Sequence, residues 1–594
     1  MSNRPTLDEQ RRNLVAQWVF DTRAILDRFH LWLTDVEEVR TGVQAHESLS
    51  FMGQGLEKAG IMTAAVTALG TRLFGRFGEG RGLDKHGLNR VKKDADAASA
   101  YSMSEALWHL SRYLPENHAL LVSIGEGLMP KVGETPEMGS NPQLGFGRVY
   151  ARPGVARYLD DRVGRLLNDP AYGWEQFWKE VQEAGITIWG AAIDTLENTT
   201  RFAKGSPTGP MTILHLFDQP LAIAQPYEGY MGNLVLPREV VEQAAERSVL
   251  LSYLTPRSLV MKSLLATYPE LKPERVHVWT LGGSSRRPRI GELWQQWEAT
   301  GAHLIEDGWT WPTGLPSFHE SGTYAPTFSV GPYRDAAGAL HLILGDGYAA
   351  SAEALQAASL DPALRLHTSL CLFSSHFDIP WDRESQIMRL DATAPDFAAT
   401  LSDLLGHPAS PTEVQDYQGI LANARAANMP LARRTVTIDD FFPNKQWRVL
   451  ALAGFMLPDP YTGHPGVEEL EPGAYRVTTR AVTERGTLDV KLTLRLREDL
   501  PQSHQVFSPL LDRFYHGLDH TRRAVKISDS GRIRNELQTL CSEALEFTAP
   551  GRVKVHFDQV DDAVLAPDKR ARIREVLRWY KAHHPIWFSW LDVD

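Results

Sequence analysis

Cysteine is nearly absent from this sequence. The 594 residues include only Cys371 and Cys541, and no pair of them has the C-x-x-C spacing. Two cysteines can form at most one disulfide, which is too few to stabilise a chain of this length. Zinc sites of the cysteine type need more thiolates than the chain contains. We therefore expect a cytoplasmic protein without a disulfide framework and without a cysteine-based zinc site.

Long apolar runs and an excess of basic residues are also lacking. Stretches such as VLALAGFML, residues 449–457, fall far short of the roughly 20 residues that cross a bilayer. The first residues, MSNRPTLDEQRRNLV, do not pair a basic region with an apolar one, so we expect no secretory signal. The net charge of −11 argues against nucleic acid and against an anionic membrane surface, because both attract proteins rich in lysine and arginine.

The common catalytic signatures are missing as well. The sequence contains no G-x-x-x-x-G-K-[ST], no G-x-S-x-G and no EF-hand loop, and HESLS at His46 lacks the second histidine of H-E-x-x-H. Phosphate-loop nucleotide hydrolysis, esterase chemistry and zincin proteolysis therefore have no support.

The hydrophobic pattern divides the chain into three regions. Residues 1–115 carry apolar side chains at helical spacing, which predicts a helical N-terminal region. Residues 116–430 alternate short apolar runs with amphipathic helical stretches. In residues 431–594, apolar and polar residues alternate on both sides of ERGT, which predicts an antiparallel hairpin within an α+β C-terminal domain.

The middle region determines the expected fold class. Apolar runs such as RVHVWTL and LHLIL are separated by amphipathic stretches such as RIGELWQQWEAT. This alternation is typical of a largely parallel sheet with helices on both faces. We therefore expect an α/β protein with such a parallel core at residues 116–430, between the helical N-terminal region and the α+β C-terminal domain.

Polar turns after the predicted strands are the candidate site, because open parallel sheets bind ligands beyond the carboxyl ends of their strands. In GGSSRR the glycines allow close backbone approach, the amides can form an anion nest, and the arginines can grip phosphate or carboxylate. The alternative is an ordinary strand-to-helix turn with solvated arginines. The predicted substrate-binding residues are Gly282, Gly283, Ser284, Ser285, Arg286 and Arg287.

A second candidate turn lies in LHLILGDGYAASAEALQ. Gly345 and Gly347 fit a loose dinucleotide fingerprint between a strand and a helix, which would make NAD(P) the cofactor. The fingerprint expects an acid about 20 residues further on, whereas the first acid beyond the next predicted strand is Asp378. Asp346 would also repel a pyrophosphate, so we rank NAD(P) below a divalent metal held by Asp346. A plain connection between strand and helix is the third interpretation.

Acids and histidines near other strand ends complete the candidate site. His376 and Asp378 stand at i and i+2, so on an extended strand end they would point the same way and could transfer a proton. The alternative is that His376 and His319 have structural roles only. The residues expected to hold Mg²⁺ or Mn²⁺ are Glu306, Asp307, His319 and Asp346.

These features predict a cytoplasmic enzyme that acts on a small phosphorylated or carboxylated metabolite. Metal-assisted isomerase, lyase and phosphatase chemistry all need anion binding, charge stabilisation and proton transfer. The alternatives are an NAD(P)-dependent oxidoreductase and a non-catalytic scaffold or assembly protein, the latter favoured by 16 tryptophans and the aromatic tail HHPIWFSWLDVD. We expect a homo-oligomer, and we expect the tail to dock on its own chain or on a neighbouring subunit.

Overall fold

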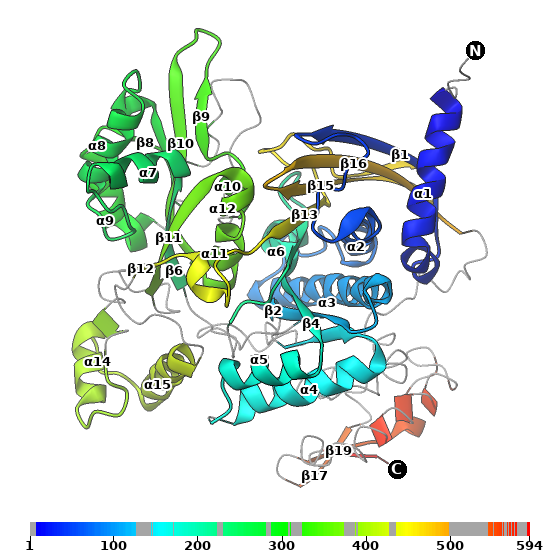
Figure 1. Cartoon of the computed structure of the whole chain (residues 1–594). Helices are drawn as coiled ribbons and strands as arrows, with labels where there is room; N and C mark the ends of the chain where they lie inside the picture. The colour runs from blue at the N-terminus through cyan, green and yellow to red at the C-terminus, as the bar shows by residue number, and fades with distance from the viewer. Residues whose placement is uncertain are drawn as a thin grey trace, which may run out of the picture.

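Two large β-sheets lie side by side, with helices between and around them (Figure 1). The computed structural model of the chain describes residues 7–125, 147–169, 171–222, 230–280, 287–306, 324–373, 390–426, 435–497, 545–549 and 552–560, with single residues and short runs elsewhere. No helix in this described part is long and apolar enough to cross a bilayer.

The larger sheet has nine strands, and antiparallel neighbours dominate it. The hairpin predicted around ERGT is confirmed, because β15 and β16 pair from Ala474 opposite Arg495 to Thr483 opposite Gly486. A ninth strand, β14 (Val467–Glu471), pairs with β15. The path across the sheet is β1 (Leu31–Thr41), β16 (Gly486–Leu496), β15 (Ala474–Thr483), β13 (Val449–Phe455), β5 (Met211–Phe217), β4 (Thr187–Glu197), β2 (His118–Ile124) and β3 (Val149–Ala151).

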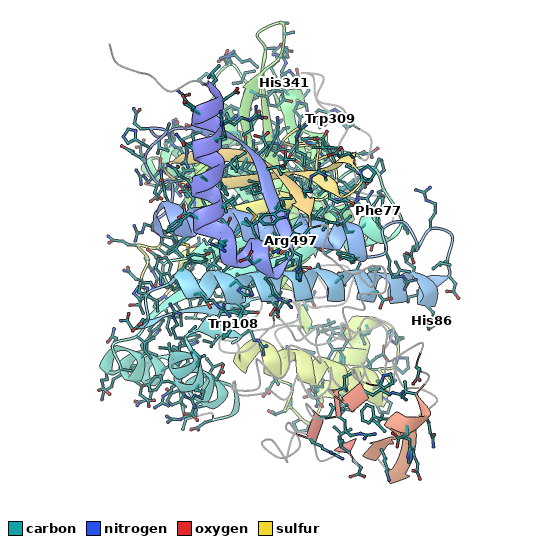
Figure 2. All side chains as sticks on the ribbon, turned by 90° about the vertical axis from the view of Figure 1, so that its right-hand side faces the viewer. Phe77, His86, Trp108, Trp309, His341 and Arg497 are labelled. Atoms are coloured by element: carbon teal, nitrogen blue, oxygen red, sulfur yellow. The ribbon has the colours of Figure 1, made fainter. Side chains whose placement is uncertain are left out.

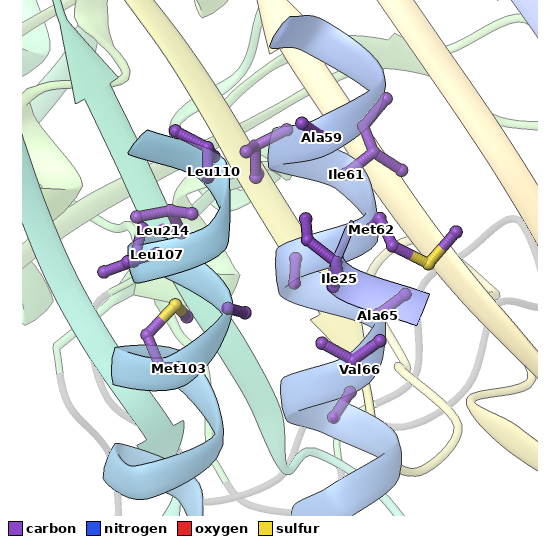
Figure 3. Packing of buried hydrophobic residues seen from close by; sticks show 14 of the residues in the cluster. Ile25, Ala59, Ile61, Met62, Ala65, Val66, Met103, Leu107, Leu110 and Leu214 are labelled. Atoms are coloured by element: carbon purple, nitrogen blue, oxygen red, sulfur yellow. The ribbon is translucent and has the colours of Figure 1, made fainter. Parts of the chain in front are cut away.

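Three helices cover one face of this sheet: α1 (Leu7–Arg28), α2 (Gly53–Phe74) and α3 (Lys85–Leu110). Figure 3 shows α2 and α3 packed against Leu214 of β5, with Ile25 of α1 beside them. Helix α2 is buried at every residue from Glu57 to Thr71 and is rich in alanine, glycine and threonine. These small side chains let it lie directly on the strands, and the hydroxyls of Thr63, Thr67 and Thr71 donate to carbonyls one turn back.

The second sheet has seven strands and mixes both directions. Strand β10 runs parallel to β7 and antiparallel to β6, while β11 is antiparallel to β6 and so runs the same way as β10. A seventh strand, β9 (Gly331–Arg334), pairs with β10. The order is β12 (Thr435–Val436), β11 (Leu366–Phe373), β6 (Tyr230–Pro237), β10 (Leu340–Ala350), β7 (Val276–Trp279) and β8 (His303–Leu304).

Helices lie on both faces of the seven-stranded sheet (Figure 1). One face shares a core with α7 (Arg238–Glu246), α8 (Arg257–Thr267) and α9 (Arg287–Glu298). The other face packs through α10 (Tyr324–Thr327), α11 (Ser351–Ala358) and α12 (Asp361–Leu364) toward β4, β5 and β13 of the nine-stranded sheet. The two sheets therefore share one continuous apolar core.

The remaining elements are peripheral to this pair of sheets. Helices α4 (Pro153–Asn168) and α5 (Trp174–Glu183) cover β2, β3 and β4, and α6 (Thr199–Ala203) contacts α3. Helices α14 (Phe397–Leu405) and α15 (Pro411–Ala426) follow the second sheet. Near the C-terminus, β17 (Leu545–Ala549), β18 (Arg552–Val555) and β19 (Leu591–Asp592) form a small sheet, so within the aromatic tail Leu591 is buried and its strand pairs with β18.

The expectation of a largely parallel core is wrong. Among the described strands only β2 with β4, β7 with β10, β7 with β8, and β18 with β19 are parallel, so the chain is mixed α/β with mostly antiparallel sheets. Strands β5 and β13 are buried at every residue and yet pair antiparallel. A continuous apolar run therefore indicates that both faces of a strand are buried, and it does not indicate whether the strand is parallel or antiparallel to its neighbours. The nine-stranded sheet also takes strands from residues 1–115, 116–430 and 431–594 alike.

Candidate ligand site between β7 and β10

The connections that leave two neighbouring parallel strands, β7 and β10, run to opposite sides. From β7 the chain passes through α9 to β8, whereas from β10 it passes through α11 and α12 to β11 on the other side. Helix α9 lies on the face that carries α7 and α8, and α11 lies on the opposite face. In open α/β sheets such a topological switch point opens a crevice beyond the carboxyl ends of the strands, where ligands bind.

The strands that precede the predicted site segments run in one direction but end at different levels of the sheet. Trp279 of β7 pairs with Gly345, and Val278 pairs with Leu304, so β7 and β8 end halfway along β10. Strand β11 runs in the same direction and ends at Phe373, level with the end of β10. The three strands therefore point the same way, but β7 ends level with Gly345 whereas β11 ends level with Ala350.

A small crevice of about 10 Å³, room for about one water-sized group, opens beside the end of β7. Asn233 of β6 is 2% exposed, and its Oδ1 accepts a hydrogen bond from the Gly347 N–H at 3.3 Å. Its Nδ2 has no hydrogen-bond partner in the described part of the chain, and neither has Oγ1 of the buried Thr280, which follows β7 directly. Buried donors without partners are costly, so they mark positions for a ligand or an ordered water. The crevice is lined by Asn233, Val235, Trp279, Pro326, Thr327, Val330 and residues 345–347.

Asp346, one of the residues that line this crevice, forms a buried ion pair with Arg257. The Nη2 of Arg257, at the start of α8, donates to Oδ1 of Asp346 at 2.9 Å, and its Nε donates to Oδ2. The indole N–H of Trp297 in α9 also donates to Oδ2, at 2.6 Å. Burial raises the pKa of Asp346, and the guanidinium opposes this by favouring the ionised carboxylate. Both carboxylate oxygens are thus engaged, and Asp346 joins β10 to α8 and α9 and does not fit a metal-ligand role.

The predicted turn at Gly345-Asp346-Gly347 is wrong. These residues lie inside β10, which continues to Ala350, and they pair with residues 233–235 of β6. Gly345 serves close packing, since a Cβ there would meet the Val235 side chain at 3.3 Å. The charge of Asp346, which looked typical of a turn, is neutralised by a partner 89 residues away in the sequence. Gly345 and Gly347 therefore do not form the dinucleotide-binding turn on which the NAD(P) interpretation depended.

The other predicted residues are only partly described. Glu306 follows β8 and is exposed, and Arg287 is the first residue of α9. Within the described residues, no group of three or more histidine, cysteine or acidic side chains is arranged to hold a metal. The predictions for the following residues lie outside the described part: Gly282, Gly283, Ser284, Ser285, Arg286, Asp307, His319, His376 and Asp378.

A row of three histidines crosses the sheet next to the crevice and was not predicted. Nδ1 of His303 lies 2.9 Å from Nδ1 of His277, whose Nε2 lies 2.9 Å from Nδ1 of His341, and Nε2 of His341 lies 3.2 Å from Asp335. Burial, aided by the neighbouring histidines, lowers the pKa of His277 to about 3, so its ring is neutral at physiological pH. Trp309 packs on His277, and Figure 2 labels His341 and Trp309 in this region. The sequence signal was a histidine flanked by apolar residues in three strands of one sheet: VHVW, AHL and LHL.

His215 looks like part of a serine–histidine pair but is structural. Its Nδ1 lies 2.6 Å from Ser359 Oγ, and its Nε2 lies 2.8 Å from the Tyr324 hydroxyl. Ser359 donates its own proton to the Gln356 carbonyl at 2.6 Å, and His215, Ser359 and Tyr324 are all completely buried. Burial lowers the pKa of His215 to about 3. The neutral ring therefore links β5 of one sheet to the helices that cover the other sheet.

Comparison with known proteins leaves the functional argument to this geometry. The crevice combines a topological switch point with one buried unpaired donor, Asn233 Nδ2, and its lining residue Asp346 is fixed by an ion pair with Arg257. No family model matches the chain, and no curated protein is significantly similar to it.

Proposed function

We propose that the chain is an enzyme that binds a small phosphorylated or carboxylated metabolite in the crevice between β7 and β10. The observation that carries the proposal is the buried, unpaired donor Asn233 Nδ2 in the crevice, with a second unpaired group, Thr280 Oγ1, directly after the end of β7. Ligand oxygens would accept hydrogen bonds from both groups, which removes the cost of leaving them unpaired. In this proposal the segment 282–287, which follows Thr280 in the sequence and includes Arg286 and Arg287, supplies the positive charge for the anion.

The proposed chemistry is that of an isomerase, lyase or phosphatase. In this proposal His376 or Asp378 transfers the proton, and Glu306, Asp307 and His319 hold Mg²⁺ or Mn²⁺. Asp346 is left out of the metal site because Arg257 and Trp297 occupy its oxygens. The position of Asp346 still matters, because it fixes β10 and thereby the crevice wall.

The proposed setting is the cytoplasm, with the enzyme assembled as a homo-oligomer. Cys371 is buried and forms no disulfide within the described part of the chain, which suits a reducing compartment. Large soluble enzymes commonly assemble with closed symmetry. Fractionation of cells and light scattering of the purified protein test these two statements directly.

The function is tested by ligand-induced thermal shifts. We expect phosphorylated sugars or organic acids to raise the melting temperature of the wild-type chain. Arg286→Ala plus Arg287→Ala removes the proposed charge, and Asn233→Leu removes the crevice amide at similar volume. Each variant is expected to weaken binding at least about tenfold, the value of one lost hydrogen bond to a charged group.

The matched control replaces two exposed arginines far from the crevice in sequence, Arg23→Ala plus Arg157→Ala. This variant should keep the full ligand-induced shift, because it loses the same charge without touching the crevice. Equal shifts in the control and in the Arg286/Arg287 variant would contradict the proposal. So would a wild-type chain that responds to none of the anionic compounds.

A further inference from the structure

We infer that a second pocket, at the opposite edge of the seven-stranded sheet, binds a small alkyl amine in its cationic form. The pocket has a volume of about 250 Å³, near the lower end of the range for small-molecule sites. This inference is independent of the proposed function. The pocket is lined by Arg238, Val241, Glu242, Asp361, Pro362, Leu366, His367, Thr437, Ile438, Asp439 and Trp447.

The location separates this pocket from the crevice. Leu366 begins β11 and pairs with Pro237, the last residue of β6, after which α7 begins at Arg238. These residues lie at the edge where β11 starts, whereas the crevice lies toward the edge where β7, β8 and β11 end. The third wall is the 3₁₀ helix η5 (Ile438–Phe441). The pocket is thus built from segments about 200 residues apart in the sequence, and it requires the folded chain.

The charge of the lining favours a cation. Three carboxyl groups, Glu242, Asp361 and Asp439, face one guanidinium, that of Arg238. Arg238 is directed to backbone oxygens, since it donates to the carbonyls of Leu366 and Asp361 at 3.3 Å each. Asp439 is held in place through Oδ1, which accepts from the Trp447 indole N–H at 2.7 Å. An incoming ammonium therefore meets an excess of negative charge, and a neutral molecule gains nothing from it.

Asp361 is the buried acid of the pocket. It is 6% exposed, and its two oxygens accept from the backbone N–H of Thr368 at 2.6 Å and from the Thr368 hydroxyl at 2.7 Å. Burial raises the pKa of Asp361 to about 7, Asp439 adds to the rise, and Thr368 and Arg238 oppose it. Such a carboxyl changes charge near neutral pH, which is typical of functional sites. A bound cation would favour its ionised form and release its proton to solvent.

Four other ionisable side chains line the pocket around Asp361. Glu242 and Arg238 come from α7, His367 from β11 and Asp439 from η5. Burial lowers the pKa of His367, with the charge of Arg238 acting in the same direction, so the imidazole is neutral at pH 7. The apolar part of the lining, Val241, Leu366, Ile438 and Trp447, suits a short alkyl chain. The combined lining fits a primary amine on a chain of a few carbons.

The inference is tested by calorimetry of the full chain with 1,4-diaminobutane, and with 1,4-butanediol as the neutral match. We expect saturable binding of the diamine and none of the diol. Affinity should be about tenfold weaker at pH 6 than at pH 8, because a group that titrates near 7 is mostly protonated at the lower pH. Titrations near pH 7 in buffers of different ionisation enthalpy should show proton release.

Variants identify the groups responsible. Glu242→Gln plus Asp439→Asn should weaken diamine binding at least about tenfold, and Asp361→Asn should abolish the pH dependence. Glu246→Gln, an exposed acid on the same helix, is the matched control and should bind as the wild type does. Absence of saturable binding at pH 8, equal binding of the diol, or full affinity in the Glu242/Asp439 variant would each overturn the inference.

Discussion

At the scale of single residues, Asp346 shows how a buried charge is tolerated. Its side chain is inaccessible, and three N–H groups from Arg257 and Trp297 satisfy its two oxygens. Arg257 in turn donates through Nη1 to the carbonyls of Tyr253 and Thr255, both at 2.6 Å. Removing one partner of such a pair leaves the other buried and uncompensated, which is far more costly than removing both.

The Asp346–Arg257 pair gives a double-mutant prediction. Asp346→Asn should lower the free energy of unfolding by about 3–5 kcal/mol, because the Arg257 guanidinium loses its buried counter-ion. Asp346→Leu combined with Arg257→Met should cost less than the Asp346 replacement alone, since no unpaired charge remains. Urea unfolding of the wild type, Asp346→Leu, Arg257→Met and their combination measures this coupling. Strictly additive losses would show that the two side chains do not stabilise one another.

The sequence alone could not reveal this pair, because nothing local links Asp346 to a residue 89 positions away. Glycine, aspartate and glycine in succession are typical of a turn, and only the tertiary contacts keep them in a strand. The histidine row was accessible in principle, since each histidine interrupts an apolar run. It required knowing that β7, β8 and β10 are neighbours.

At the scale of elements, hydrophobic patterns predicted structure best where one face meets water. The alternating hairpin of β15 and β16 was predicted correctly, because the period of two fixes which side chains are buried. Strands β5 and β13, buried throughout, carry no such alternation. Their direction depends on which strand lies next to them, and this is decided by contacts distant in sequence.

The close contact between helix α2 and strand β13 leads to a prediction about stability. A Cβ on Gly454 would come within 2.5 Å of the Ala64 carbonyl oxygen, which is backbone and cannot rotate away. Gly454→Ala should therefore separate helix and sheet and lower the free energy of unfolding by about 1–3 kcal/mol. Gly154→Ala in α4, where a Cβ meets no atom within 4 Å, is the control and should leave stability unchanged or slightly raised. Chemical denaturation of both variants tests the difference; equal stability would contradict direct contact between α2 and β13.

At the scale of the whole molecule, the division of the sequence into consecutive regions does not match the sheets. The first strand, β1, pairs with β16 across more than 400 residues, from Leu31 opposite Leu496 to Thr41 opposite Thr487. Composition changes along a chain mark candidate boundaries, but strand pairing over such a separation leaves no trace in local patterns. The same limit applies to the candidate site: strand ends could be predicted, whereas the direction of the strands relative to one another needed the sheet order.

The buried histidines give the last prediction, the effect of acid on the whole fold. His215, between the two sheets, and His277 have pKa values of about 3 in the folded chain, well below the ordinary value near 6.5. The unfolded chain therefore binds about one more proton in total at these two sites than the folded chain at pH 6.5, and about two more at pH 5, so stability is full only well above pH 6.5 and falls as the pH drops toward 3. Asp361, whose pKa is raised to about 7, has the opposite effect, because the folded chain binds about one more proton there than the unfolded chain does. Urea unfolding at pH 7.5, 6 and 5 should thus show declining stability, a steeper decline in Asp361→Asn and a shallower one in His215→Asn. A pH dependence that is the same in all three proteins would mean that these buried groups do not control the acid response.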